Sequence, residues 1–251
     1  MNKVFVFDLD DTLMDNMHDY ANPILDMARV IIRELGSKAP HVSVIITKEQ
    51  EIDKARVHEI NPATGRIFLY SIERFPGSMV MVYRYFCKNA KVEPNKMVEQ
   101  ELYTIGMQAF DPARYKDQVR PDANSTIFFL YDQKDLPMLL TKGDKRVQAN
   151  KFSAIDAGRL FFRSRIVEDK TPETFRLMKT GFNGNESWYS VGNDYDKDIV
   201  PAFDAGFKGI WIPVETWEAM GKIEEIRARV DWSRCVELRS LSEIKERYGE
   251  L

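Results

Sequence analysis

The sequence predicts an α/β fold with a parallel sheet core and an inserted, mostly α-helical domain. Three observations favour this fold class. Val4–Phe7 is apolar at every position, as expected of a parallel strand buried on both faces. From Pro121 onward, strand-like and helix-like segments alternate, which is the pattern of βα repeats in a parallel sheet. Between about residues 41 and 118 that alternation is absent, and several separate helix starts take its place.

Further apolar or β-branched segments are expected to be strands of the same sheet: Leu136–Leu140, Ser164–Val167, Trp188–Val191, Gly209–Ile212 and Cys235–Leu238. A box formed by Ser240 and Glu243 predicts a last helix after them. Open α/β sheets bind ligands at the carboxyl ends of their strands. Polar residues just beyond each strand are therefore the first candidates for a functional site.

The inserted segment begins with a predicted helix. Apolar residues recur at helical spacing from Pro23 to Leu35, and Gly36 predicts the end of this helix. Helix starts are also indicated at three later places: Thr47 with Gln50, Ser78 and Asn95. Residues 41–46 could instead form a strand, and residues 61–65 form a turn. The segment is therefore expected to be mostly helical.

Composition excludes several classes of protein. The chain has 36 Lys+Arg against 39 Asp+Glu, a net charge of −3, and so lacks the basic field that phosphate-backbone binding requires. Cys87 and Cys235 are its only cysteines, which indicates neither a disulfide framework nor a zinc site. No apolar run has the length of a membrane span. We expect a soluble, cytoplasmic protein with no nucleic-acid polymer and no membrane as partner.

Polar side chains follow four of the predicted strands. They are Asp8 and Asp10 after the first, Thr141 after the second, Lys170 beyond the third, and Asn193, Asp194 and Asp198 after the fourth. Taken singly, each has an ordinary structural explanation, because short motifs recur by chance. As an ordered set, they predict a site at one edge of the sheet.

These residues resemble the four motifs of the haloacid dehalogenase-like superfamily, in the order Asp8-Leu-Asp10-Asp-Thr12, Leu-Leu-Thr141, Lys170, and Gly192-Asn-Asp194-Tyr-Asp-Lys-Asp198. Gln148 and Lys151 after the second motif, and Pro201 after the fourth, are similar to the phosphatase-like branch with a helical cap inserted after the first motif. The resemblance implies a Rossmann-like catalytic core of residues 1–16 and 119–251 and a helical cap domain of residues 17–118.

The resemblance also implies roles for the first motif. Asp8 would be the nucleophile and a metal ligand, and its family counterpart forms a phosphoaspartate. The Asp10 side chain would act as general acid and base, and its main-chain carbonyl would ligate the metal. Mg²⁺ is the implied cofactor, because it prefers hard oxygen ligands and usually keeps substrate oxygens and waters in its shell.

The other motifs would hold the phosphoryl group and complete the metal site. Thr141, Lys142 and Lys170 are the expected phosphate-binding residues, with Lys170 also catalytic. Asn193 or Asp194 would be a further metal ligand, supported by Asp198. Position in the motif favours Asn193, whereas a carboxylate suits Mg²⁺ better than an amide does. Both alternatives stay open from the sequence.

The predicted activity is Mg²⁺-dependent hydrolysis of small phosphate monoesters, with a small phosphorylated metabolite as substrate. The alternatives are a phosphotransferase or mutase with the same aspartyl chemistry and a binding or regulatory protein that retains the fold. Dehalogenation is disfavoured because Asp10 supplies an acid that a halide leaving group does not need. A hydrolytic triad lacks support, since no Ser or Cys nucleophile pairs with His18, His41 or His58. The sequence leaves the oligomeric state open.

Overall fold

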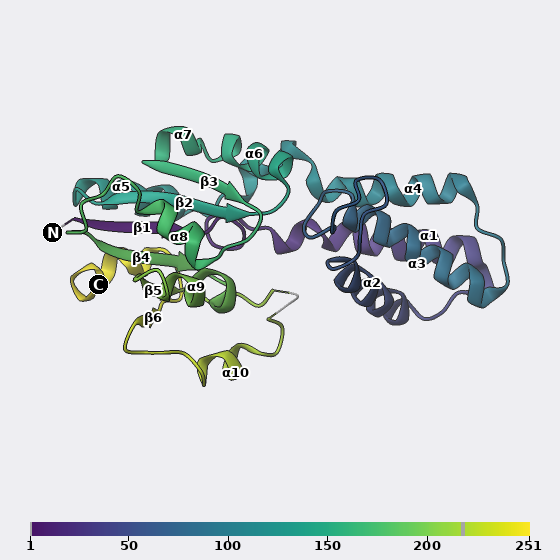
Figure 1. The fold of residues 1–251 in the computed structure, drawn as a ribbon. Coiled ribbons are helices and arrows are strands. Elements are labelled where there is room, and N and C mark those ends of the chain that lie inside the picture. Colours follow the sequence, from purple (N-terminus) through teal and green to yellow (C-terminus); the bar gives the residue numbers. More distant parts are fainter. Residues whose placement is uncertain (1, 217–218) are drawn as a thin grey trace. The chain divides into compact units, whose positions relative to one another are not determined.

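The computed structural model describes residues 2–216 and 219–251, which divide into two compact units (Figure 1). The sheet unit comprises Met1–Met17 and Pro112–Leu251, and the helical unit comprises His18–Asp111. The sequence expects the second division after residue 118. In the structure the 3₁₀ segment η4 (Pro112–Gln118) lies in the sheet unit, because it packs against α6 (Lys145–Ala154) and buries Tyr115.

The sheet unit contains a six-stranded parallel sheet in the order β3-β2-β1-β4-β5-β6. Its strands, drawn as arrows in Figure 1, are β1 (Lys3–Phe7), β2 (Leu136–Lys142), β3 (Arg163–Val167), β4 (Ser187–Gly192), β5 (Lys208–Trp211) and β6 (Cys235–Glu237). All six correspond to segments expected from the sequence. The α/β fold class is confirmed.

Helices cover both faces of this sheet. The helical elements are α5 (Ala123–Asp132), α6, α7 (Ala157–Leu160), α8 (Pro172–Met178), η5 (Tyr195–Ile199), α9 (Val200–Phe203), α10 (Ile223–Arg227), α11 (Ser242–Glu246) and η6 (Tyr248–Glu250). Side chains of α8 and α9 pack with Val4, Val6 and Met138 in one buried cluster. Figure 1 shows α8 in front of the strands and α5 behind them. A sheet buried on both faces explains why its central strands are apolar throughout.

β1 lies at the centre of the sheet and pairs with both β2 and β4. Phe7 is in register with Leu139 on one side and with Val191 on the other, so the carboxyl ends of three neighbouring strands reach the same edge. The chain places β2 and β3 on one side of β1 and β4 to β6 on the other, and this reversal is a topological switch point. β2 extends past the expected end, and Thr141 lies within it, paired with Ile166 of β3.

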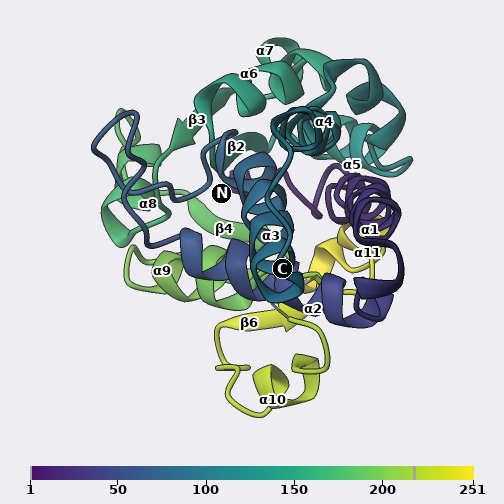
Figure 2. The same ribbon diagram turned by 90° about the vertical axis from the view of Figure 1, so that its right-hand side faces the viewer.

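The helical unit contains α1 (Ala21–Leu35), α2 (Val42–Arg56), α3 (Arg74–Ala90) and α4 (Lys96–Met107), which pack against one another (Figures 1 and 2). Its 3₁₀ segments are η2 (Gly36–Lys38) and η3 (Gln108–Phe110), and η1 (Met17–Asp19) enters it. One apolar cluster, including Met27, Ile31, Met79 and Leu102, forms its core. Within the described residues this unit has no strand, as its amphipathic spacing predicts.

Two of the expected helix termini are confirmed. Gly36 is the C-cap of α1, with a positive φ of 53° that a glycine adopts readily. Asn95 is the N-cap of α4, and its side chain accepts a hydrogen bond from the amide of Met97.

Three other expected starts, and the alternative strand at residues 41–46, are wrong. α2 begins at Val42, where the His41 ring accepts a hydrogen bond from the amide of Ser43, so Thr47 lies inside the helix. Ser78 also lies inside a helix, and its hydroxyl bonds to the Asp53 carboxylate and the Arg74 carbonyl. α11 begins at Ser242, beyond Ser240. Thr47 and Ser78 therefore lie within helices that begin earlier in the chain, and Ser240 lies two residues before the start of its helix.

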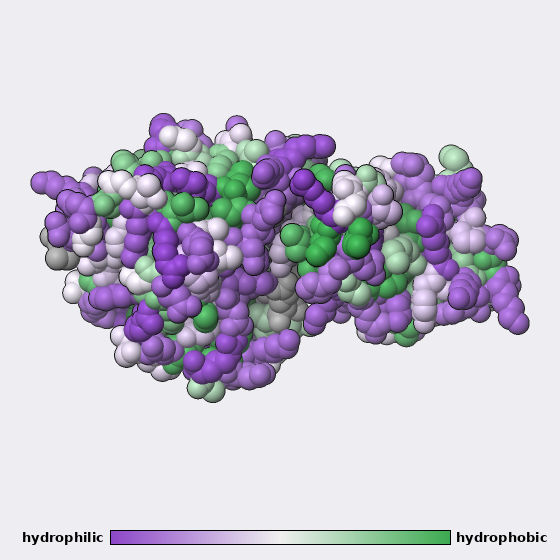
Figure 3. All heavy atoms as spheres, viewed as in Figure 1, coloured by the Kyte–Doolittle hydropathy of each residue, from purple (hydrophilic) through white to green (hydrophobic). Residues whose placement is uncertain are grey.

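No helix of the described residues is long and apolar enough to cross a membrane. On the face shown in Figure 3, hydrophilic side chains predominate and apolar ones gather in small groups.

Glu49 of α2 is a buried acid in the helical unit, 2% exposed. Its Oε1 atom has no hydrogen-bond partner among the described residues. Burial raises the pKa of Glu49 to about 8, with the Asp53 carboxylate adding to the shift and Arg74 opposing it. The folded protein therefore favours the neutral form of this side chain.

Replacing Glu49 by Gln should make the free energy of unfolding less sensitive to a rise in pH. Between its ordinary pKa of 4.5 and about 8, Glu49 ionises in the unfolded chain but stays protonated when folded, so the wild type loses stability as pH rises. The advantage of Glu49→Gln in free energy of unfolding should grow by about 1–3 kcal/mol from pH 5 to pH 8, measured by urea denaturation. Glu51→Gln, exposed on the same helix, should show no such growth. A pH-independent difference for Glu49→Gln would contradict the prediction.

Candidate active site

Asp8 is the first residue after β1, and its main-chain N–H bonds to the Val191 carbonyl of β4 at 2.8 Å. Its two carboxylate oxygens face different partners. Oδ1 accepts a hydrogen bond from the Lys170 ammonium, and Oδ2 lies 3.3 Å from the Thr12 hydroxyl. The Asp8 side chain is therefore fixed at the carboxyl edge of the sheet, with one oxygen towards a cation and the other towards a hydroxyl.

Lys170, which follows β3, is buried between two carboxylates. Its Nζ donates to Asp8 Oδ1 and to Asp198 Oδ1, the latter at 2.7 Å. Asp198 is itself held in place, because its Oδ2 accepts from the Asp194 amide at 3.0 Å and its carbonyl accepts from the Ser190 hydroxyl at 2.7 Å. Asp198 is therefore fixed in position beside the Lys170 ammonium.

The charges around Lys170 are unbalanced. Burial raises the pKa of Asp8, and the neighbouring Asp198 and Asp10 add to this shift, while Lys170 opposes it. Burial alone would lower the pKa of Lys170, but Asp198 and Asp8 outweigh it and raise the pKa above its ordinary value. Lys170 therefore remains a cation, and the excess of carboxylates favours an additional positive charge nearby.

Asn193 and Asp194, just beyond β4, have different contacts. Asn193 Oδ1 lies 3.3 Å from the Thr12 hydroxyl, the same hydroxyl that contacts Asp8, and the Asn193 carbonyl accepts from the Trp211 indole at 2.8 Å. Asp194 caps η5 by accepting from the amides of Asp196 and Lys197, both at 3.1 Å, and pairs with the Lys197 ammonium at 3.0 Å. The structure thus brings the Asn193 side chain, rather than that of Asp194, to the Thr12 hydroxyl, which also contacts Asp8.

Asp10 has surroundings of its own. Lys151 Nζ lies 2.5 Å from Oδ1, and Gln148 Nε2 donates to Oδ2 at 2.7 Å. Gln148 Oε1 in turn accepts from the Thr141 hydroxyl at 3.4 Å. The end of β1 is thereby linked through α6 to the end of β2.

Lys142 lies at the end of β2, one residue after Thr141. Its ammonium pairs with Asp169 Oδ1 at 2.9 Å. Asp169 directly precedes Lys170 in the chain. The three histidines are in the helical unit, and His41 caps α2. Among residues 2–216 and 219–251, no group of three or more His, Cys, Asp and Glu side chains is arranged to hold a metal ion.

No protein-family model and no curated protein matches this sequence. Solved structures do match. A haloacid dehalogenase-like family hydrolase from Xanthomonas campestris is 18% identical with a TM-score of 0.68, over 99% of this chain and 95% of that one. The chain has the haloacid dehalogenase-like fold. The HAD-hydrolase YfnB from Bacillus subtilis, bound to magnesium, is 16% identical with a TM-score of 0.59 over 99% of both chains.

The haloacid dehalogenase-like fold hosts more than one chemistry among the matched structures. A HAD phosphatase from Thermococcus onnurineus is 18% identical with a TM-score of 0.56, over 99% of this chain and 98% of that one. The L-2-haloacid dehalogenase from Xanthobacter autotrophicus is 13% identical with a TM-score of 0.50 over 100% of both. Because one fold supports both, the activity must be argued from the residues of the site.

The sequence assigns no individual role to two side chains near Asp10, Gln148 and Lys151. Both belong to the resemblance after the second motif. Their spacing of three on a helix places them on one face, but nothing local in the sequence shows that this face meets Asp10. Thr12 belongs to the first motif, and its contacts with Asp8 and Asn193 appear only in the fold.

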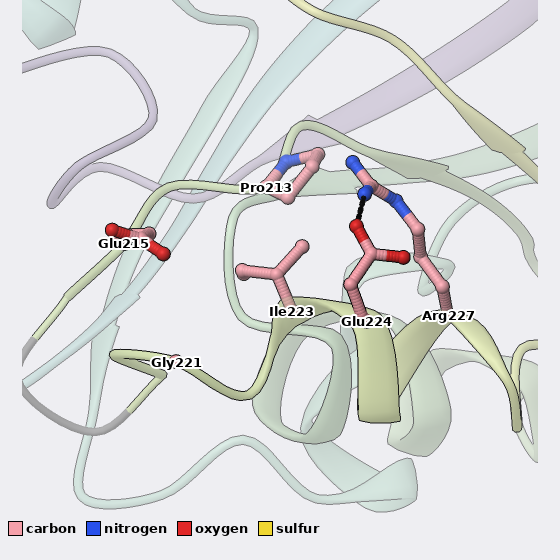
Figure 4. Close-up of a pocket in the computed structure, with 6 residues that line it drawn as sticks. All are labelled: Pro213, Glu215, Gly221, Ile223, Glu224 and Arg227. Atoms are coloured by element: carbon pink, nitrogen blue, oxygen red, sulfur yellow. Dashed lines mark hydrogen bonds and ion pairs between the residues drawn. The ribbon is translucent and has the colours of Figure 1, made fainter.

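A separate pocket of about 370 Å³ lies beyond β5 and beside α10 (Figure 4). It is lined by Pro213, Glu215, Gly221, Ile223, Glu224 and Arg227. It contains none of the residues at Asp8, and its Arg227 is already paired with Glu224 and Glu237. This pocket is therefore separate from the residues gathered around Asp8.

Gly192, the last residue of β4, has no room for a side chain, since an added Cβ would overlap the Asp198 carboxylate. Gly192→Ala should lower the free energy of unfolding by about 1–3 kcal/mol in a denaturant titration. Gly158→Ala is the matched control, because an added Cβ there meets nothing within 4 Å. Equal stability of the two variants would argue against the described packing of Asp198.

Proposed function

We propose that this protein hydrolyses small phosphate monoesters with Mg²⁺ and forms a phosphoaspartate on Asp8. The observation that carries the proposal is the separate environment of two carboxylates two residues apart. Asp8 contacts Lys170 and Thr12, whereas Asp10 contacts Gln148 and Lys151. Distinct environments allow one carboxylate to act as nucleophile and the other to exchange a proton.

The donor atoms fit Mg²⁺. Asp8 Oδ2 and Asn193 Oδ1 both lie 3.3 Å from the Thr12 hydroxyl, so two hard oxygen ligands from β1 and β4 converge. The main-chain carbonyl of Asp10 is the third proposed ligand. Mg²⁺ commonly binds through one or two carboxylates and keeps waters and phosphate oxygens. When bound, it would neutralise the negative charge of the phosphoryl group.

The reaction would proceed in two displacements. The Asp8 carboxylate attacks phosphorus, the bond between phosphorus and the ester oxygen breaks, and Asp10 gives its proton to that oxygen. Asp10 then takes a proton from a water that attacks phosphorus, and the bond between phosphorus and Asp8 breaks. Lys170 and Thr141, with Lys142 at the end of β2, would bind the phosphoryl oxygens.

The position of Asp10 favours an oxygen leaving group over a halide. An alkoxide must be protonated as it leaves, and a halide need not be. The phosphotransferase alternative uses the same residues with a hydroxyl in place of water, so product analysis separates it from hydrolysis.

Asp8→Asn should lower Mg²⁺-dependent phosphate release from p-nitrophenyl phosphate by more than about 10³-fold, because an amide cannot serve as the nucleophile. Steady-state assays with and without Mg²⁺ test this. Asp132→Asn, the same substitution at the exposed end of α5, is the control and should keep wild-type activity. Full activity of Asp8→Asn would overturn the proposed mechanism.

Asn193→Ala should raise the Mg²⁺ concentration needed for half-maximal activity by at least about 10-fold, since it removes a proposed ligand. Asp194→Ala should raise that concentration less and lower thermal stability more, because Asp194 caps η5. A Mg²⁺ titration at saturating substrate, with a thermal melt of each variant, measures both effects. The reverse order would assign the metal to Asp194.

A further inference from the structure

We propose that Lys151 and Gln148 are positioning residues that hold the Asp10 carboxylate for proton transfer to and from the phosphate ester. This inference rests on the proposed phosphatase function. It assigns a task to two side chains that contact Asp10 and not the nucleophile.

The contacts fix both oxygens of Asp10. Lys151 Nζ lies 2.5 Å from Oδ1, and Gln148 Nε2 lies 2.7 Å from Oδ2. The Gln148 amide has one orientation that satisfies both of its neighbours, with its oxygen accepting from Thr141 and its NH₂ donating to Asp10. The carboxylate is thereby held at two points, which restricts rotation of the Asp10 side chain.

Lys151 is itself held by its surroundings. It is 3% exposed, and its ammonium also donates to Asn16 Oδ1 at 2.7 Å and lies 5.5 Å from the centre of the Tyr115 ring. Burying an ammonium is costly unless its donors are paired. Because Asp10 and Asn16 provide the pairing, the position of Lys151 and the position of Asp10 depend on each other.

The local backbone places these partners. The Asp144 side chain caps α6 by accepting from the amides of Arg146 and Val147, and Gln148 and Lys151 follow on one face of this helix. Gly143, with φ of 141°, lies so close that an added Cβ would be 2.9 Å from Gln148 Nε2. On the other side, Asp11 accepts from the amide of Asn16 at 2.9 Å. The loop at Gly143 therefore contacts Gln148, and the loop at Asn16 contacts Lys151.

The side chain of Asp10 is 24% exposed, so without these contacts it could rotate towards solvent. A displacement of about 1 Å in a reacting group can cost on the order of 10²-fold in rate. That loss should depend on the substrate. An alcohol leaving group needs the proton of Asp10, whereas a strongly acidic phenol leaves without it.

The test compares kcat/KM of Lys151→Met for two substrates with Mg²⁺ present. For 2-phenylethyl phosphate, which has a poor leaving group, we expect a decrease of about 10- to 100-fold. For 2,4-dinitrophenyl phosphate we expect a decrease of less than about threefold. Gln148→Met should show the same selectivity. The ratio of the two values is independent of the folded fraction, so partial misfolding does not obscure the result.

Controls separate this proposal from its rivals. Lys145→Met removes an exposed lysine from the same helix and should leave both values unchanged. In an Asp10→Asn background, Lys151→Met should add no further selective loss, because the two residues act through one proton transfer. An equal decrease for both substrates would overturn the inference and make Lys151 a phosphate ligand or a structural residue. A failure of the proposed function would give a different result from a failure of this inference. In that case the wild type itself would release no phosphate, or Asp8→Asn would remain active.

Discussion

The buried ammonium of Lys170, held between Asp8 and Asp198, is the interaction on which the site depends. It joins residues that follow β1, β3 and β4, so it forms only when the parallel sheet has assembled with those ends at one edge. Removing a single partner from such a buried pair would leave an uncompensated charge. The fold and the site are for this reason not separable: the contact that neutralises Asp8 is also a contact between distant parts of the chain.

A second buried lysine pairs with another carboxylate of the first motif. Lys170 lies beside Asp8, and Lys151 lies beside Asp10. Asp8 shares its lysine with Asp198, whereas Asp10 has a lysine to itself. Their neutral partners also differ, Thr12 in one case and Gln148 in the other. Two identical side chains separated by one residue can then differ in chemistry, because their environments differ.

Much of this arrangement could be predicted from the sequence. The apolar strands and their order of appearance identified the sheet, and the rule that ligands bind at strand carboxyl ends selected Asp8, Thr141 and Lys170. The sequence could not show which of Asn193 and Asp194 reaches Thr12. Both are polar loop residues, and only the backbone path decides which one caps η5. The helix starts at Thr47 and Ser78 failed for a related reason. A hydroxyl residue favours a cap locally, but earlier starts at Val42 and Arg74 bury more apolar surface in the helical unit.

The close approach of Gly143 to the Gln148 amide has an evolutionary consequence. Any residue with a Cβ at position 143 would press on that amide, and the amide is the link between Thr141 and Asp10. Substitutions at positions 143 and 148 are therefore expected to be epistatic: a larger residue at 143 would be tolerated mainly after position 148 has changed. The two positions should be inherited as a pair, and a lineage that lost the glycine would have to hold the Asp10 carboxylate by other means.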